Sequence, residues 1–68
     1  IFCLLEVSLL SLGNEPPLVE VMNYMDEKDF QLYDISQFMR RPYDKALYQC
    51  DFLFIKKNST FISQKRWN

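Results

Sequence analysis

The segment that decides the fold is residues 47–57, LYQCDFLFIKK, because apolar side chains occur in both alternating sets of its positions. Successive side chains of a strand point to opposite faces, so a strand over residues 47–56 carries apolar groups on each face. One face holds Tyr48, Cys50, Phe52 and Phe54, and the other holds Gln49, Asp51, Leu53 and Ile55. The pattern predicts a strand with two largely apolar faces.

Working back from this strand, residues 36–46 form a polar and basic connection that contains Arg40-Arg41-Pro42. Proline has no backbone N–H to give to a sheet, and these eleven residues show no helical periodicity. Such a connection suits an antiparallel return better than a parallel crossover. Before it, residues 30–35, FQLYDI, show the alternation that is typical of a second strand.

Residues 17–29 predict an amphipathic helix with one buried face. Its apolar positions recur at the spacing i, i+3, i+4 and i+7, at Leu18, Val21, Met22 and Met25. The loop before the helix is marked by Pro16-Pro17 and by the only glycine of the chain, Gly13.

Residues 1–10, IFCLLEVSLL, predict another strand, which Glu6 and Ser8 alone interrupt with polar groups. Because the apolar side chains do not alternate, both faces of this strand are expected to be buried, as in an interior parallel strand. A strand, a helix and a strand form a right-handed βαβ unit whose strands are parallel. We therefore predict an α/β fold of order β-α-β-β with an antiparallel last strand, followed by a polar tail at residues 58–68.

A sheet of this size with one helix leaves its second face uncovered. A chain of about 60 residues buries only about 60% of the surface that its unfolded form exposes. With 68 residues, 49% of them hydrophobic, this chain needs further cover. We expect the missing sheet to come from a partner chain or from an N-terminal part before Ile1. In the second case residues 1–57 are the C-terminal part of a larger domain, cut within its first strand.

Composition argues against several classes of function. Eight Lys and Arg oppose nine Asp and Glu, and a net charge of −1 speaks against nucleic-acid or membrane-surface binding by bulk charge. Two cysteines and no histidine speak against a zinc site or a disulfide framework. The first apolar run stops at Glu6, too early for a transmembrane helix, and no secretory leader is found. We expect no metal, free core thiols at Cys3 and Cys50, and a cytoplasmic location.

Five short motifs then narrow the family: LEVSLL at residues 5–10, PLVEV at 17–21, FQLYDI at 30–35, RRP at 40–42 and QCDFLF at 49–54. In this order and spacing they resemble the C-terminal part of the FkbM-type methyltransferases, over about residues 4–67. Those proteins are S-adenosylmethionine-dependent O-methyltransferases of the Rossmann-like class. The resemblance rests on the set of motifs and not on any single one.

The resemblance implies a class I methyltransferase sheet in which an antiparallel last strand inserts between two parallel strands. It also implies S-adenosylmethionine as cofactor of the parent enzyme and a small molecule or sugar as methyl acceptor. The cofactor loop of such enzymes is glycine-rich, whereas this chain has only Gly13, after the wrong strand. We therefore expect the chain by itself to bind no S-adenosylmethionine and to transfer no methyl group.

Four residues are candidates for the functional site. Glu6 is an acid in an apolar strand, where an ionised group is costly unless it is paired, and it is either a catalytic carboxylate or half of a structural salt bridge. Arg40, Arg41 and Tyr43 lie in the long connection and either bind substrate or form a solvated basic turn.

The sequence also predicts local contacts for two further acids, and it leaves two functions of the chain open. Asp34 and Asp51 are expected to cap or pair locally with the arginines of the connection. The chain is either part of an O-methyltransferase or a noncatalytic βαββ module that completes its sheet with a partner chain. In both cases the exposed sheet would let the chain self-associate.

Overall fold

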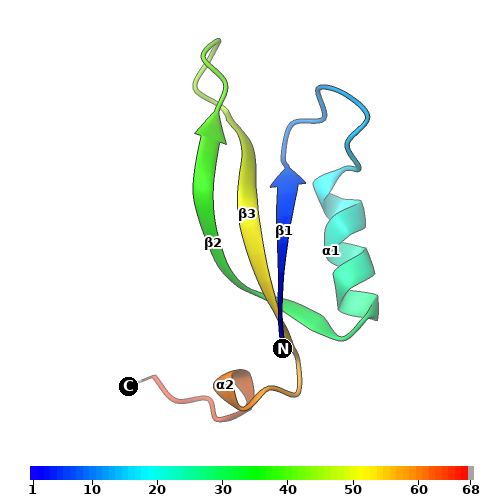
Figure 1. The fold of residues 1–68 in the computed structure, drawn as a ribbon, viewed down its shortest axis with the longest axis vertical. Helices are drawn as coiled ribbons and strands as arrows, with labels where there is room; N and C mark the ends of the chain where they lie inside the picture. Colours follow the sequence, from blue (N-terminus) through cyan, green and yellow to red (C-terminus); the bar gives the residue numbers. More distant parts are fainter. Residues whose placement is uncertain (68) are drawn as a thin grey trace.

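The computed structural model describes residues 1–67 and contains, in chain order, β1 (Phe2–Ser8), α1 (Leu18–Glu27), β2 (Phe30–Arg40), β3 (Leu47–Lys56) and α2 (Thr60–Ser63). The three strands form one sheet in the order β1-β3-β2. Because β3 is antiparallel to both neighbours, β1 and β2 run parallel to each other (Figure 1). The α/β class, the β-α-β-β order and the antiparallel last strand are confirmed.

The core lies between α1 and one face of the sheet. β1 and β3 pair in regular register, so alternate pairs such as Leu5 opposite Phe52 and Val7 opposite Cys50 point to the same side. The buried cluster on that side consists of Val7, Met25, Cys50, Phe52 and Phe54. The apolar stripe expected for the helix packs here as predicted, with Leu18, Val21 and Met22 half-buried around Met25.

Helix α1 begins after the proline pair and ends earlier than the expected 17–29. The carbonyl of Pro17 accepts hydrogen bonds from the backbone N–H groups of Glu20 at 3.0 Å and Val21 at 3.3 Å. At the other end Asp29 adopts a φ of 64°, which turns the chain into β2. Its carbonyl accepts a hydrogen bond from the backbone N–H of Lys57 at 2.9 Å, so this turn is tied to the end of β3.

Strand β2 is longer than the expected 30–35, and the polar connection 36–46 shortens to a turn over residues 41–46. The pairing of β2 with β3 shifts register three times, between Leu32 and Asp34, between Ser36 and Met39, and between Met39 and Arg40. Gln37, within the second shift, has a φ of 57°. Each irregularity breaks the alternation of side chains between faces. The sequence of residues 36–40 therefore lacks a strand pattern, although its backbone is held by β3.

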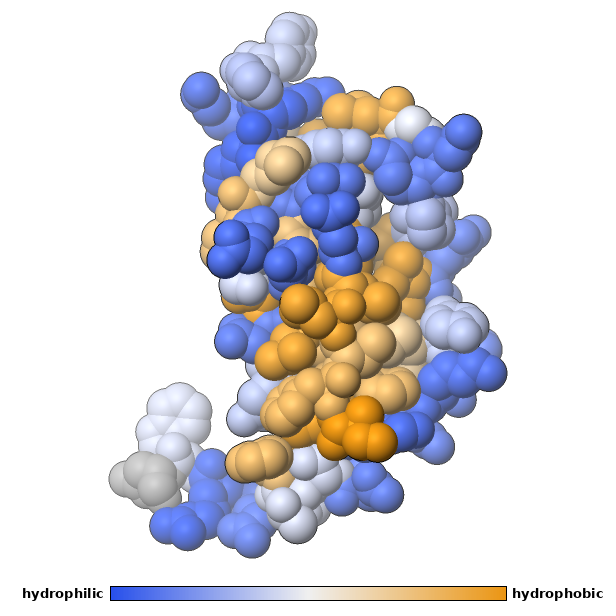
Figure 2. Space-filling model, viewed as in Figure 1, coloured by the Kyte–Doolittle hydropathy of each residue, from blue (hydrophilic) through white to orange (hydrophobic). Residues whose placement is uncertain are grey.

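The other face of the sheet, called here the open face, is not covered by a helix of comparable length. It carries apolar side chains near the start of β1, where Leu4 lies opposite Leu53 and Phe2 opposite Ile55. Leu4 is 61% exposed and Phe2 51%, and the rings of Phe2 and Tyr33 are 5.9 Å apart. Figure 2 shows apolar side chains gathered over the middle and lower part of the strands.

The predicted tail at residues 58–68 contains the short helix α2, which follows β3 near the start of β1 (Figure 1). The hydroxyl of Ser59 caps it by accepting a hydrogen bond from the backbone N–H of Phe61 at 3.2 Å. The ring of Phe61 lies 6.2 Å from that of Phe2 but stays 70% exposed, so the tail only borders the open face.

The structure also places the two cysteines and shows the character of the helices. Cys3 is half-buried, Cys50 is buried, and both are free thiols, as predicted. Desolvation raises the pKa of the Cys50 thiol, with a smaller contribution from the charge of Asp51. No helix among residues 1–67 has the length and apolar character needed to cross a membrane.

Candidate functional site

The carboxyl ends of β1 and β2 lie at the same end of the sheet (Figure 1). Residues 9–17, which follow β1, and the turn 41–46, which follows β2, are found at this end too. In open α/β sheets, ligands bind beyond the carboxyl ends of the parallel strands. A ligand is therefore expected to bind among the side chains of this end, called here the carboxyl end of the sheet.

Glu6 is exposed, so the expectation of an acid enclosed in an apolar strand is wrong for residues 1–67. It belongs to the open face because α1 packs on the other one. Glu6 lies directly opposite Asp51 of β3, which in turn lies opposite Ser36 of β2. Opposite like charges on neighbouring strands repel each other. Among residues 1–67 no basic side chain forms an ion pair with either carboxylate, so a structural salt bridge of Glu6 requires a partner outside these residues.

Glu6, Asp51 and Ser36 form a polar row across the strands, and Ser8 and Gln49 extend it toward the carboxyl end. They are opposite each other in the ladder, and the side-chain amide of Gln49 donates a hydrogen bond to the Ser8 hydroxyl at 3.0 Å. Ser8 is only 6% exposed, and this bond gives its buried hydroxyl a partner. The open face thus divides into an apolar half near the start of β1 and a polar half near its end.

A contact between a carboxylate and a phenol fixes the loop after β1. The hydroxyl of Tyr48 donates to Oε1 of Glu15 at 2.5 Å, and the backbone N–H of Gly13 donates to Oε2 at 2.7 Å. The bond from Tyr48 is the largest cause that lowers the pKa of Glu15, and the same bond raises the pKa of Tyr48. Glu15 therefore stays ionised and Tyr48 stays protonated at neutral pH.

The sequence interpretation missed this pair because its members are 33 positions apart and only the fold brings them together. The only local signal is an acidic residue next to Pro16-Pro17, two positions after the single glycine. A Cβ placed on Gly13 would lie 3.0 Å from the Glu15 carboxylate, so this glycine makes room for a side chain of its own loop.

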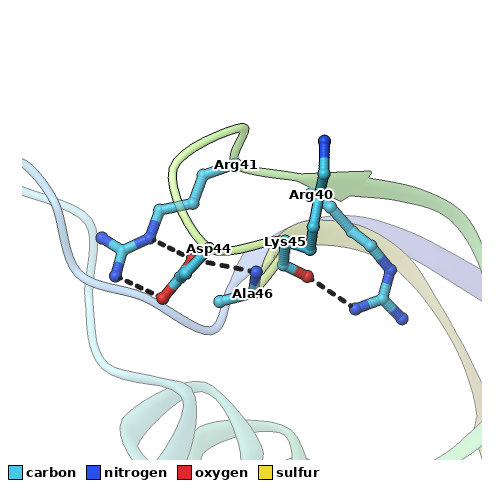
Figure 3. Close-up of polar contacts among 5 residues, drawn as sticks. All are labelled: Arg40, Arg41, Asp44, Lys45 and Ala46. Carbon is cyan, nitrogen blue, oxygen red and sulfur yellow. Dashed lines mark hydrogen bonds and ion pairs between the residues drawn. The ribbon is translucent and has the colours of Figure 1, made fainter.

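The turn 41–46 is organised by Arg41 and Asp44. The Nε and Nη2 atoms of Arg41 donate to the two carboxylate oxygens of Asp44 at 2.8 and 2.9 Å, and the backbone N–H of Ala46 donates to Oδ1 at 3.0 Å (Figure 3). The guanidinium group is the largest cause that holds the pKa of Asp44 well below its usual range, and Asp44 raises the pKa of Arg41. The role of Arg41 in this structure is to close the turn.

Arg40 and Tyr43 are placed differently from Arg41. Arg40 is the last residue of β2, and its guanidinium group lies on the other side of the turn from that of Arg41 (Figure 3). Nη1 of Arg40 donates to the backbone carbonyl of Lys45 at 3.1 Å. Tyr43 is 88% exposed, with the Arg41 guanidinium carbon 5.3 Å from its ring centroid. Arg40 and Tyr43 therefore present polar groups to solvent at the carboxyl end.

The expected pairing of Asp34 and Asp51 with these arginines is wrong. Oδ1 of Asp34 accepts a hydrogen bond from the backbone N–H of Ile35 at 2.8 Å. Asp51 faces Glu6 across the ladder instead. The arginine partner is Asp44, three positions after Arg41 and within the same turn.

The residues described here do not include the glycine-rich loop that would hold S-adenosylmethionine. Gly13 packs on Glu15 of its own loop, and residues 1–67 contain no other glycine whose backbone could approach a cofactor. Within the same range there is no group of three or more Cys, Asp or Glu side chains that could hold a metal ion. Comparisons of the chain with protein-family models, with curated proteins and with solved structures find no match.

Proposed function

We propose that residues 1–57 are the C-terminal β-α-β-β portion of a Rossmann-like class I methyltransferase sheet, in an O-methyltransferase of the FkbM type. The observation that carries the proposal is the position of β3, which runs antiparallel between two parallel strands that α1 connects. This arrangement is the one that the resemblance implies for the last three strands of such a sheet.

The free edge of β1 gives the proposal further support. In residues 1–67, β1 pairs with β3 alone, so its second row of backbone N–H and C=O groups has no strand partner. A hollow of about 390 Å³ runs beside this edge and is lined by Leu5, Pro16, Glu20, Val21 and Tyr24. An apolar hollow next to an unpaired strand suits a sheet that continues past β1. In the proposed enzyme the next strand of the sheet lies here.

The chain's own residues would contribute to acceptor binding and to proton transfer. Methyl transfer to a hydroxyl needs a positioned acceptor and a group that takes up the hydroxyl proton. With no histidine in the sequence, the acids of the polar half are the candidate bases, Glu6 first because it is exposed and Asp51 as its neighbour. Arg40 and Tyr43 would contact the acceptor, which the proposal takes to be a small molecule or a sugar.

Calorimetry and turnover test this proposal. The 68-residue chain should show no micromolar binding of S-adenosylmethionine, because it lacks the glycine-rich loop, whereas the protein with its N-terminal half should bind the cofactor. In that protein Glu6→Gln should lower turnover by at least about a hundredfold, which is the lower end of the range for loss of a general base. The matched control is Glu27→Gln, an exposed acid at the end of α1 that does not line the hollow.

Two results would overturn it: micromolar cofactor binding by the 68-residue chain, or an upstream coding sequence without a strand followed by a glycine-rich turn and an acidic strand end. Unchanged turnover in the Glu6→Gln variant would remove the catalytic role of Glu6 alone.

A second candidate function is a noncatalytic module that completes its sheet with a partner chain. It draws on the same free edge of β1 and on the exposed apolar half of the open face. Size exclusion separates the two candidates, since a module should give a dimer of defined size, whereas part of an enzyme with an uncovered sheet should give folded but associated species without a defined size.

A further inference from the structure

The turn 41–46 is held in one shape by its own hydrogen bonds. Arg41 donates two hydrogen bonds to the carboxylate of Asp44, an arrangement called here the fork. In addition, the backbone N–H of Arg41 donates to the carbonyl of Ala46, and the backbone N–H of Lys45 donates to the carbonyl of Arg41, each at 3.0 Å. Lys45 takes up the left-handed conformation, with a φ of 66°. A loop that is already ordered loses little entropy when it binds a ligand.

The two arginines next to this turn differ in whether their charge is neutralised. Arg41 gives two N–H groups to the two oxygens of one carboxylate, which is the strongest geometry for this pair. Arg40 gives one N–H group to an uncharged backbone carbonyl, and in residues 1–67 no carboxylate lies within ion-pair distance of it. The bond to Lys45 orients the Arg40 guanidinium and leaves its charge uncompensated.

Lys45 is a second cation of the same turn. Its ammonium group forms no ion pair within the described chain, and its backbone is in direct contact with Arg40. Two unpaired cations thus lie within six residues of sequence in a protein whose net charge is −1. Both are exposed at the carboxyl end of the sheet.

From these observations we propose that Arg40, supported by the charge of Lys45, is an anion-binding site and that the ligand of this end of the sheet carries a phosphate or carboxylate group. A guanidinium with a fixed plane binds either group through two parallel N–H···O bonds. The identification of that ligand with the methyl acceptor rests on the proposed function. The anion site itself does not, since it needs neither the cofactor nor the missing part of the sheet.

The test is a titration of the 68-residue chain with inorganic phosphate and, separately, with succinate, followed by the NMR signals of the arginine Nε–H groups and, in the variants as well, by those of the backbone amides of the turn 41–46. We expect a saturable shift of the Arg40 signal at millimolar anion and little change for Arg41, which is already paired. The variant Arg40→Gln should weaken the binding about tenfold, as for loss of a hydrogen bond to a charged group. Arg40→Lys should weaken it less, because it keeps the charge and loses the fork.

Lys28→Gln is the matched control for net charge, because it removes one cation from the opposite end of the sheet, after α1. It should bind the anions as the unaltered chain does. Saturation by phosphate alone, or by succinate alone, identifies which group the ligand carries. The proposal is overturned if neither anion saturates the Arg40 signal, if Arg40→Gln binds as before, or if Lys28→Gln weakens binding equally. Each of these outcomes leaves the methyltransferase proposal to its own test.

Discussion

The two faces of the sheet differ in how their apolar side chains are covered. On the face toward α1, Cys50, Phe52 and Phe54 of β3 are all at most 6% exposed. On the open face the apolar side chains of the outer strands stay largely in contact with water, as Leu4 at 61% and Phe2 at 51% show. A small chain gains stability in proportion to the apolar area it buries, so the face toward α1 supplies most of the stability of this sheet. Of the apolar side chains on the open face, Ile55 of β3 is buried, whereas those of the outer strand β1 have no cover.

The largest expected effect on the free energy of unfolding comes from a substitution on the face toward α1. Phe54→Ala removes a ring that is 1% exposed, and such substitutions cost about 3–5 kcal/mol. Because domains of this size have little more stability than that, the variant should be largely unfolded. Circular dichroism during urea unfolding measures the change.

The matched control for this substitution is Leu53→Ala, one position away on the opposite face and only half-buried. It should cost less than about 2 kcal/mol, because less area is lost from the core. Equal destabilisation by both variants would mean that the two faces are equally covered in solution, and the contrast between them would then fail.

The next effect concerns association through the open face. Replacing Phe2 and Leu4 by Ser and Thr removes the most exposed apolar pair of β1 without touching the core. We expect the unaltered chain to elute from size exclusion as an associated species and the double variant as a smaller one, since exposed apolar patches drive association. Val19→Ser is the control, an equally exposed apolar residue on α1. If the unaltered chain elutes as a compact monomer, the open face does not need cover.

How far the sequence predicts this molecule also differs between the two faces. The core and the helix stripe follow from periodicity, because each of Leu18, Val21 and Met25 falls where a regular helix places it. Residues 36–40 have no such pattern, since the three register shifts in β2 uncouple the position of a residue in the sequence from the face on which its side chain lies. The strand there is held by its pairing with β3, which is tertiary information.

The site residues follow the same rule. Glu6 was expected to be enclosed because the sequence shows apolar neighbours but not which face the helix covers. The contact of Tyr48 with Glu15 depends on where a loop folds back. Only the pair of Arg41 and Asp44 is local enough for its spacing to have indicated it.

A smaller effect is expected from the Tyr48 and Glu15 contact, which reports on the carboxyl end of the sheet. Since the pKa of Glu15 is lowered in the fold, its contribution to stability is complete above the ordinary value of 4.5 and is lost as the pH falls below it. Since the pKa of Tyr48 is raised, its contribution is complete below the ordinary value of 10.0 and is lost as the pH rises above it.

Tyr48→Phe should therefore lower the melting temperature at neutral pH and weaken the pH dependence at both extremes. Melting curves between acid and alkaline pH measure this. Tyr43→Phe is the control, since its ring is 88% exposed and its hydroxyl is not the one that Glu15 binds. If the melting temperature of Tyr48→Phe falls at acid and alkaline pH as much as that of the unaltered chain, this hydrogen bond does not hold the loop of residues 9–17.

The smallest effect on stability is expected at the turn 41–46, where Asp44→Asn breaks the fork with Arg41. An exposed ion pair adds little to the free energy of unfolding, so urea unfolding should shift only slightly. The local order of the turn should fall much more, because the same carboxylate also accepts the Ala46 N–H. Amide hydrogen exchange of residues 41–46 should accelerate while that of β3 stays slow.

Asp51→Asn is the contrasting variant, since it relieves the repulsion with Glu6 and should leave the turn unchanged. If exchange at the turn is equally slow in both variants, the fork does not order it. Arg40 would then lack the fixed neighbour on which its orientation depends.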